Sequence, residues 1–225
     1  MLSIATPPRL PLIAPSILSA DFGRMVEDCT QVINAGADLL HVDVMDGHFA
    51  PNLTMGPDMC RGIRRAMSDV YLDVHLMVTD PDKYVDAFAA AGANMFTFHI
   101  EAVRDDEVDP LVARIRARGM HAGLAINPPT AVERILPHLG SIDMALVMSV
   151  NPGFSGQKFI HETLMKTARI RAELRPDQRL QMDGGVSPEN AAAVREAGCD
   201  VIVGGSAIFG QSSENRAKAI ARMRG

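Results

Sequence analysis

The stretch "LLHVDVMDGHFAPN" at residues 39–52 begins with an apolar segment, Leu39 to Met45, that contains one histidine and one aspartate. Seven residues of this composition predict a β-strand buried on both faces, as in a parallel sheet covered by helices. His41 and Asp43 are two residues apart, so their side chains point to the same face of that strand. A buried polar pair is costly unless it is paired or bound to a metal. The stretch therefore predicts a fold class and a candidate site together.

Similar apolar segments alternate with helix-like segments along the whole chain. The expected strands cover residues 12–18, 39–45, 71–78, 95–101, 121–127, 144–150, 179–185 and 201–208. The expected helices cover residues 21–35, 57–67, 81–91, 106–118, 130–138, 161–173, 188–197 and 212–224. Eight strand–helix units in 225 residues favour a (β/α)8 TIM barrel of the α/β class over the alternative, a doubly wound open sheet. We expect one domain over residues 1–225, in which residues 1–10 are a short N-terminal extension.

A short repeat supports this division. The segments "AGAD" (35–38), "AGAN" (91–94) and "AGCD" (197–200) each end an expected helix and precede an expected strand. Glycine at that position suits the left-handed residue that closes a helix. Helix starts are indicated by the N-cap residues Asp21, Asp80 and Ser187, of which the last two precede a proline.

Composition limits the partners and the compartment. A net charge of −5 and a pI near 5.8 give no electrostatic reason to expect nucleic acid or an anionic membrane. The three cysteines lie far apart without a C-x-x-C motif, which fits a reducing cytosol and argues against disulfides or a thiolate zinc site. The chain shows neither a signal peptide nor a long apolar run. We expect a cytoplasmic protein without membrane or nucleic-acid partners.

Polar side chains gather where the expected strands end, which is where a (β/α)8 barrel carries its active site. They are His41 and Asp43 on the second strand, His75 on the third and Asp183 on the seventh. Taken singly, a buried histidine is more often a hydrogen-bonded core residue, and a strand-end aspartate more often a cap. Four at equivalent heights favour one shared site. Two imidazoles with two carboxylates suit zinc, iron, cobalt or manganese better than calcium.

Other polar and soft residues near these strand ends leave alternatives open. Met45, Met77 and Met148 share the inward faces and are either adaptable core filler or an apolar wall beside the metal. His99 and Glu101 are either partners of the site or polar residues of the core. Asp73 lies two residues deeper than His75 and is assigned to the barrel interior.

Two glycine-rich segments predict a phosphate site. "DGGV" (183–186) and "GGSAIF" (204–209) follow or end the seventh and eighth expected strands, where this fold usually binds phosphate. Glycine lets backbone N–H groups approach phosphate oxygens, and Ser206 could add a hydroxyl donor. "NPGFSGQKF" (151–159) reads either as a mobile loop that closes over a ligand or as an ordinary surface turn.

Together these parts suggest one chemistry. A phosphate anchor would hold one end of a small substrate, while a metal on a ketone and its neighbouring hydroxyl would stabilise an enediolate. Two carboxylates on opposite faces could remove the proton α to the carbonyl and return one to the other side. That sequence of steps inverts one stereocentre.

Eight motifs from residue 14 to residue 209 resemble the ribulose-phosphate 3-epimerase family. They are "APSILSADF" (14–22), "HVDVMDGHF" (41–49), "PNLTMGP" (51–57), "DVHLMV" (73–78), "LAINP" (124–128), "MSVNPGF" (148–154), "DGGV" (183–186) and "GSAIF" (205–209). The resemblance implies a TIM-barrel isomerase that interconverts D-ribulose 5-phosphate and D-xylulose 5-phosphate. It also implies one divalent metal ion, a role in carbohydrate metabolism through the pentose phosphate pathway, and a homo-oligomer.

The resemblance also implies residue roles. Asp43 and Asp183 match the acid/base pair, and His41, Asp43, His75 and Asp183 match the metal ligands. The positions that match substrate and phosphate contacts are Ser16, His75, Gly153, Phe154, Ser155, Gly156, Gly184, Gly185, Gly205 and Ser206.

One departure and three rival interpretations remain. Ser155 stands where the family usually has glycine, and serine would be strained there if the position needs a positive φ. An epimerase of another phosphoketose, such as D-allulose 6-phosphate, would use the same metal and carboxylates. A lyase or decarboxylase would be expected to place a lysine among the acidic residues, where this chain has none. A non-catalytic sugar-phosphate binder would be expected to lack Asp43 or Asp183. The sequence does not identify the metal.

Overall fold

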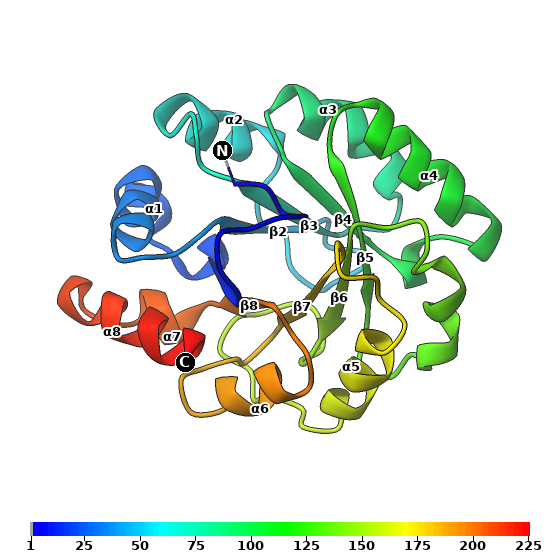
Figure 1. The fold of residues 1–225 in the computed structure, drawn as a ribbon. Helices are drawn as coiled ribbons and strands as arrows, with labels where there is room; N and C mark the ends of the chain where they lie inside the picture. Colours follow the sequence, from blue (N-terminus) through cyan, green and yellow to red (C-terminus); the bar gives the residue numbers. More distant parts are fainter. Residues whose placement is uncertain (1) are drawn as a thin grey trace.

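Eight parallel strands form a ring with helices around it in the computed structural model, which describes residues 2–225 (Figure 1). The strands are β1 (Leu12–Pro15), β2 (Leu40–Met45), β3 (Leu72–Met77), β4 (Met95–His99), β5 (His121–Ile126), β6 (Met144–Met148), β7 (Arg179–Asp183) and β8 (Val201–Gly204). Each strand from β2 to β7 pairs with the next one along the chain, and β8 pairs with β1. A bridge between Ser16, which follows β1, and His41, near the start of β2, connects these two strands. The expected (β/α)8 barrel is confirmed.

The helices follow the strands, but several expected elements differ. The strands expected over 12–18 and 95–101 end at Pro15 and His99, and a 3-10 turn follows each of them. The helices are α1 (Met25–Asn34), α2 (Pro57–Ala66), α3 (Val85–Ala90), α4 (Asp105–Ala117), α5 (Thr163–Arg171), α6 (Ala191–Glu196), α7 (Ser206–Phe209) and α8 (Ser213–Arg224). The helix expected over 130–138 is instead two 3-10 turns, η5 (Val132–Arg134) and η6 (Leu136–His138). Pro137 has no N–H group to donate to a preceding turn, and it lies in the first turn of η6. The strand expected over 201–208 ends at Gly204, and its second half is α7.

Among residues 2–225, four further 3-10 turns lie between the strands and the helices that follow them. Asp21 and Asp80, two of the expected N-cap residues, each precede one of these turns. The turns are η1 (Ile17–Ser19), η2 (Phe22–Arg24), η3 (Pro81–Tyr84) and η4 (Ile100–Ala102). Asp21 caps η2 by accepting a hydrogen bond from Gly23 N–H at 2.9 Å. Asp80 precedes η3 without such a bond. Ser187 begins a turn that leads into α6, whose own N-cap is Asn190.

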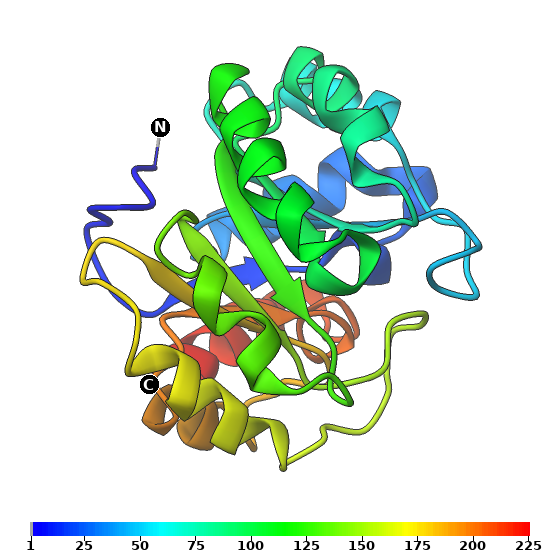
Figure 2. The same cartoon turned by 90° about the vertical axis from the view of Figure 1, so that its right-hand side faces the viewer.

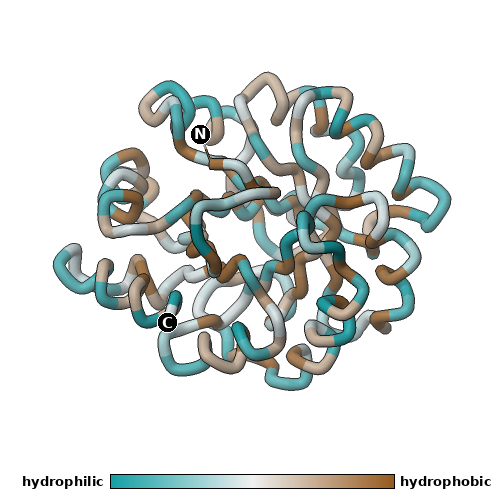
Figure 3. The backbone as a smooth tube through the Cα atoms, in the orientation of Figure 1, coloured by the Kyte–Doolittle hydropathy of each residue, from teal (hydrophilic) through white to brown (hydrophobic). Residues whose placement is uncertain are grey.

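Successive strand residues pack on opposite sides of the sheet. One set faces the helices and forms the larger core, for example Val42, Val74 and Phe96. The alternate set faces the barrel axis, where Leu39 and Tyr71 belong to a separate apolar cluster. Figure 3 shows the hydrophobic segments concentrated in the strands and on the inner sides of the helices. Because both faces are buried, the strands are continuously apolar apart from the polar residues of the interior.

Three aspartates and one asparagine bind backbone N–H groups at the base of the barrel, the end where the strands begin. Each stands at the start of an even-numbered strand and accepts a hydrogen bond from a backbone N–H of the preceding strand. They are Asp38 to Ile13 at 2.8 Å, Asn94 to Leu72 at 2.8 Å, Asp143 to Ala122 at 2.8 Å and Asp200 to Leu180 at 2.7 Å. In the three repeated segments, the glycines Gly36, Gly92 and Gly198 have φ of 106°, 87° and 100°. The repeat therefore encodes a helix end followed by a strand-start anchor.

The N-terminal segment lies across this base and is anchored there. Ile4 is buried and joins the apolar cluster on the barrel axis. The buried Arg179 guanidinium donates to the carbonyls of Ile4 and Ala5, both at 2.9 Å. Figure 2 shows this segment at the opposite end of the barrel from the loops after β2 and β6. Residue 1, which the expected extension includes, lies outside the described residues.

Candidate functional site

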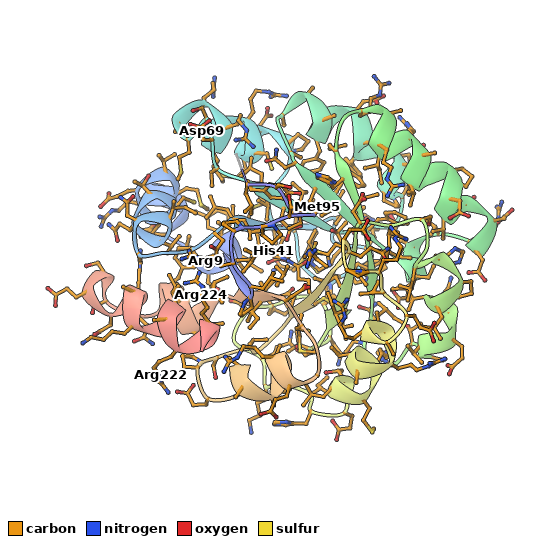
Figure 4. The ribbon with its side chains drawn as sticks, in the orientation of Figure 1. Arg9, His41, Asp69, Met95, Arg222 and Arg224 are labelled. Atoms are coloured by element: carbon orange, nitrogen blue, oxygen red, sulfur yellow. The ribbon has the colours of Figure 1, made fainter. Side chains whose placement is uncertain are left out.

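The four predicted metal ligands converge on the barrel axis at the carboxyl ends of the strands. His41 and Asp43 lie on β2, His75 on β3 and Asp183 at the end of β7. One ligand atom from each residue lies within 4.8 Å of those of the other three. Figure 4 shows His41 at the centre of the ring of strands. This arrangement can hold one metal ion.

Both imidazoles turn one nitrogen toward the two carboxyl groups. His41 Nε2 lies 3.3 Å from Asp43 Oδ1 and 3.9 Å from Asp183 Oδ2. His75 Nδ1 lies 3.0 Å and 3.7 Å from the same two atoms. His41 Nε2 is buried and has no hydrogen-bond partner among the described residues. An orphaned imidazole nitrogen beside two carboxylates fits a divalent transition metal better than a purely hydrogen-bonded core.

The two carboxyl groups differ in their protonation. Burial alone would raise the pKa of Asp43, but the charge of the nearby His41 and the hydrogen bond with His75 lower it well below its usual value. Burial and the neighbouring Asp43 carboxylate raise the pKa of Asp183 to about 7. Burial opposes charge on His41, yet Asp43 and Asp73 raise its pKa well above normal. A bound cation would displace the shared protons and lower the pKa of both carboxyls.

The cavity above these residues contains most of the predicted substrate contacts. Asp43 and Asp183 line it together with Ser16, whose hydroxyl donates to Asp43 Oδ2 at 2.5 Å. Eight further predicted positions line it as well: Gly153, Phe154, Ser155, Gly156, Gly184, Gly185, Gly205 and Ser206. His75, also predicted as a substrate contact, is fully buried and is not among the lining residues.

Apolar residues complete the cavity wall. Met45, Met77 and Met148 line it, so the structure places all three methionines at the cavity as well as in the packed interior. Leu18 and Ser19 after β1 also line it, and the motif analysis did not single them out. Both lie in the quoted motif of residues 14–22, and Ser19 ends η1 while Leu18 lies within it.

The glycines after β7 bring the loop after β6 close to the site. Gly184 and Gly185 have φ of 117° and 62°. A Cβ atom on Gly185 would lie 2.7 Å from the carbonyl oxygen of Gln157 and 2.8 Å from the amide nitrogen of Phe159. These glycines therefore serve close backbone packing, in addition to any role toward a phosphate.

The strain considered for Ser155 does not arise. In residues 2–225 every residue with a positive φ is a glycine, so Ser155 has ordinary backbone geometry. The flanking Gly153 and Gly156 have φ of 149° and 80°. The loop thus takes its unusual conformation at its glycines. Phe154 is 58% exposed at the tip.

A second set of polar side chains lies behind the metal-ligand candidates. Asp73 Oδ2 lies 2.7 Å from His41 Nδ1 and accepts from Gln181 Nε2 at 2.6 Å. His99, at the end of β4, lies against His75. Asp73 was expected in the interior, but its contact with His41 depends on strand register: the two residues are direct neighbours across β2 and β3. Gln181 was not singled out, although it precedes Asp183 by two residues.

Comparison with known proteins places the chain among one enzyme family. The sequence model of the ribulose-phosphate 3 epimerase family matches residues 12–209. Ribulose-phosphate 3-epimerase of Serratia marcescens is 48% identical over 203 residues, which are 89% of this chain and 96% of that protein. The enzyme of the same name from Bacillus subtilis is 44% identical over 217 residues, covering 95% of this chain and 98% of that protein.

Solved structures with low sequence identity share the fold. 3-Hexulose-6-phosphate synthase superposes with a TM-score of 0.69 at 17% identity, covering 95% of this chain and 98% of that one. Tryptophan synthase subunit alpha of Legionella pneumophila gives 0.64 at 17% identity, covering 95% and 91%. These matches support the barrel alone. Within residues 2–225, no helix is both long and apolar enough to span a bilayer.

Proposed function

The chain belongs to the ribulose-phosphate 3-epimerase family and is therefore an isomerase. We propose that it interconverts D-ribulose 5-phosphate and D-xylulose 5-phosphate: one carboxyl group removes the C3 proton, and a second one returns a proton to the other side of C3. The observation that carries this proposal is the position of Asp43 and Asp183, which come from β2 and β7 and line one cavity. Without a cation their pKa values shift in opposite directions, which shows that the two carboxyl groups have different surroundings.

His41, Asp43, His75 and Asp183 are the residues that would hold a divalent cation, which we propose is zinc, iron, manganese or cobalt. A cation there would supply Lewis acidity, which stabilises negative charge on the oxygens of a ketose. The unpaired Nε2 of His41 supports this assignment.

The two carboxyl groups are the proposed proton acceptor and proton donor. One carboxylate takes the proton from C3, and the electrons of that C–H bond enter the enediolate of the substrate. The other carboxyl group then gives its proton to C3 from the opposite face, which inverts the stereocentre. Ser16 donates to Asp43 and keeps that carboxylate oriented toward the cavity. Met45, Met77 and Met148 exclude water from this part of the site.

The glycine-rich ends of β7 and β8 support a phosphate grip. Gly184, Gly185, Gly205 and Ser206 line the same cavity as the two carboxyls. We propose that their backbone N–H groups and the Ser206 hydroxyl bind the phosphate, while residues 153–156 close over the sugar.

The setting of the enzyme is inferred from the resemblance. We propose a homo-oligomeric, cytoplasmic enzyme that acts in the pentose phosphate pathway. A relative from Oryza sativa, 43% identical over 201 residues, is named a cytoplasmic isoform.

Proton NMR of D-ribulose 5-phosphate in D2O tests the function, with the metal-loaded protein and after chelation. We expect deuterium at C3 together with D-xylulose 5-phosphate, and loss of both on chelation. Turnover that survives complete metal removal would refute the metal. Absence of exchange in both samples would refute the substrate, and D-allulose 6-phosphate would be tested next. Binding of these sugars without exchange would indicate a non-catalytic binder.

A further inference from the structure

A chain of hydrogen bonds leads from His75 away from the proposed metal site. His75 Nε2 lies 2.8 Å from His99 Nε2, and His99 Nδ1 lies 3.1 Å from Glu101 Oε2. Both imidazole rings are fully buried, so water cannot replace these partners. The other carboxylate oxygen, Glu101 Oε1, accepts from the backbone N–H of Asn127 at 2.9 Å. The chain therefore ends on a fixed backbone donor at the end of β5.

The carboxylate at the end of this chain decides where each ring proton lies. A carboxylate only accepts hydrogen bonds, so His99 carries its proton on Nδ1 and presents a lone pair at Nε2. His75 must then donate from Nε2, which leaves the lone pair of its Nδ1 free. Without a cation, Asp43 Oδ1 at 3.0 Å accepts a hydrogen bond from this nitrogen and so competes with Glu101 for the position of the proton. A cation bound beside Asp43 removes that competition and leaves Nδ1 as a ligand.

The other histidine of the site has the same arrangement without an intermediate ring. His41 Nδ1 lies 2.7 Å from the buried Asp73 carboxylate, so this nitrogen carries a proton and Nε2 faces the site. Metal-binding histidines usually have such a carboxylate on their other nitrogen. In this protein one histidine contacts its carboxylate directly, and the other reaches one through a second histidine.

We propose that Glu101 is a positioning residue that acts through His99 to hold His75 in the tautomer whose Nδ1 can bind the cation. This inference rests on the proposed metal site. It adds that Glu101, which does not line the cavity and is connected to His75 through two hydrogen bonds, controls whether His75 Nδ1 can bind a cation.

The substitution Glu101→Gln separates this role from simple packing. Glutamine has nearly the same shape but only one acceptor oxygen. If that oxygen accepts from Asn127 N–H, the amide NH2 faces His99 Nδ1, which must then become an acceptor. His99 would carry its proton on Nε2, His75 would carry its own on Nδ1, and the proton would point into the ligand cluster. The substitution Glu101→Gln, which replaces one carboxylate oxygen by an NH2 group, would therefore reverse the tautomers of both His99 and His75.

Long-range 1H–15N NMR of protein labelled with 15N-histidine reads each tautomer directly. In the zinc-loaded wild type we expect His75 protonated on Nε2 and His99 on Nδ1. In Glu101→Gln we expect His99 protonated on Nε2. The wild-type spectrum tests the proposal even if the variant fails to fold, because the opposite tautomers in wild type would overturn it.

Zinc affinity, measured by competition with a chelator, supplies the second readout. We expect Glu101→Gln to weaken zinc binding by about 10- to 100-fold. The control is Glu173→Gln, at an exposed residue that pairs with Arg169, and it should change neither readout. Excess zinc should restore kcat in Glu101→Gln, which loss of packing alone would not allow. Unchanged tautomers with unchanged zinc affinity would refute the role of Glu101. A wild type that binds no zinc but shows the expected tautomers would refute the metal site instead.

Discussion

Asp43 and Asp183 have different surroundings although they line the same cavity. Asp43 is fixed by Ser16, His41 and His75, whereas Asp183 has no comparable set of donors and keeps a raised pKa of about 7. In a two-carboxyl epimerisation each group serves as base in one direction and as acid in the other. The difference concerns the metal-free protein, and the substrate's stereochemistry decides which group takes the proton in each direction.

Asp183→Asn should lower interconversion by about 10²- to 10⁴-fold at saturating metal, because asparagine can neither take nor return the C3 proton. Asp43→Asn should have an effect of the same order. Turnover of both epimers is followed by NMR, with bound metal quantified in the same samples. Asp177→Asn, at an exposed residue paired with Arg175, serves as control and should retain full activity. Full turnover in Asp43→Asn with metal bound would contradict the base assignment.

The sequence identifies residues that contact the cavity better than the residues that support them. His41 and Asp43 stand out because they interrupt an apolar strand at two-residue spacing. Asp73 follows the same spacing with His75, but its partner His41 is on another strand, 32 residues earlier. That contact depends on the register of β2 against β3, which hydrophobic patterning does not specify to a single residue across the sheet. The relay from His75 to Glu101 likewise crosses from β3 to β4.

At the scale of elements, Asp46 connects the loop after β2 to the end of β3. Its carboxylate accepts from the backbone N–H groups of His48 and Phe49 and from the N–H and hydroxyl of Thr79, at 2.8 to 2.9 Å. Burial alone would raise the pKa of Asp46, but these hydrogen bonds lower it to about 2. The ionised Asp46 side chain thus connects the loop "DGHFAPN" (46–52) to Thr79.

Asp46→Asn should lower the free energy of unfolding at neutral pH by about 1 kcal/mol, after allowance for solvent screening. Since the folded pKa lies below the ordinary value of 3.8, the contribution is fully present above about pH 4. It is lost as the pH falls toward 2. Urea unfolding of wild type and variant between pH 7 and pH 2.5 checks this: the two should converge in acid. A difference that stays constant with pH would show that Asp46 acts through shape alone.

Gly185 makes the contact between the end of β7 and the loop after β6. Gly185→Ala should raise the KM for the phosphosugar at least 10-fold, because its Cβ atom would collide with the backbone of Gln157 and Phe159. Gly156→Ala is the matched comparison: its φ is also positive, at 80°, but nothing lies within 4 Å of the added atom. It should cost about 1 kcal/mol of stability with a smaller change in KM. Equal kinetic effects of the two substitutions would show that backbone strain, and not loop displacement, is responsible.

The elements themselves were largely predictable, and the exceptions have local causes. Eight apolar segments marked the eight strands because a parallel barrel buries both faces of its sheet. The expected helix over 130–138 was wrong: this segment forms two short 3-10 turns, and Pro137 lies in the second of them. The end of β8 was misplaced because "SAIF" is apolar enough for a strand, whereas in the fold it starts α7.

At the scale of the whole molecule, the two ends of the barrel have separate tasks. Loops and ionisable groups gather at the carboxyl ends of the strands, while the base carries the four strand-start anchors and the N-terminal segment. Figure 2 shows that segment at the far end from the loops after β2 and β6. Ion pairs connect the two ends of the chain at the base: Arg9 and Arg224 both bind the Asp38 carboxylate. Figure 4 shows these two arginines close together.

This separation predicts that the base can be weakened without a change in chemistry. Ile4→Ala should lower the free energy of unfolding by about 2 to 4 kcal/mol, because Ile4 is 2% exposed and fills the apolar cluster on the barrel axis. The kcat and KM at 25 °C should stay within twofold of wild type. Leu10→Ala, at a residue 48% exposed in the same segment, should change stability by less than about 0.5 kcal/mol. If fully folded Ile4→Ala protein showed a lower kcat, packing at the base would affect the positions of the carboxyl groups in the site. We do not expect this, because the buried side chains of the barrel interior separate the base from the site.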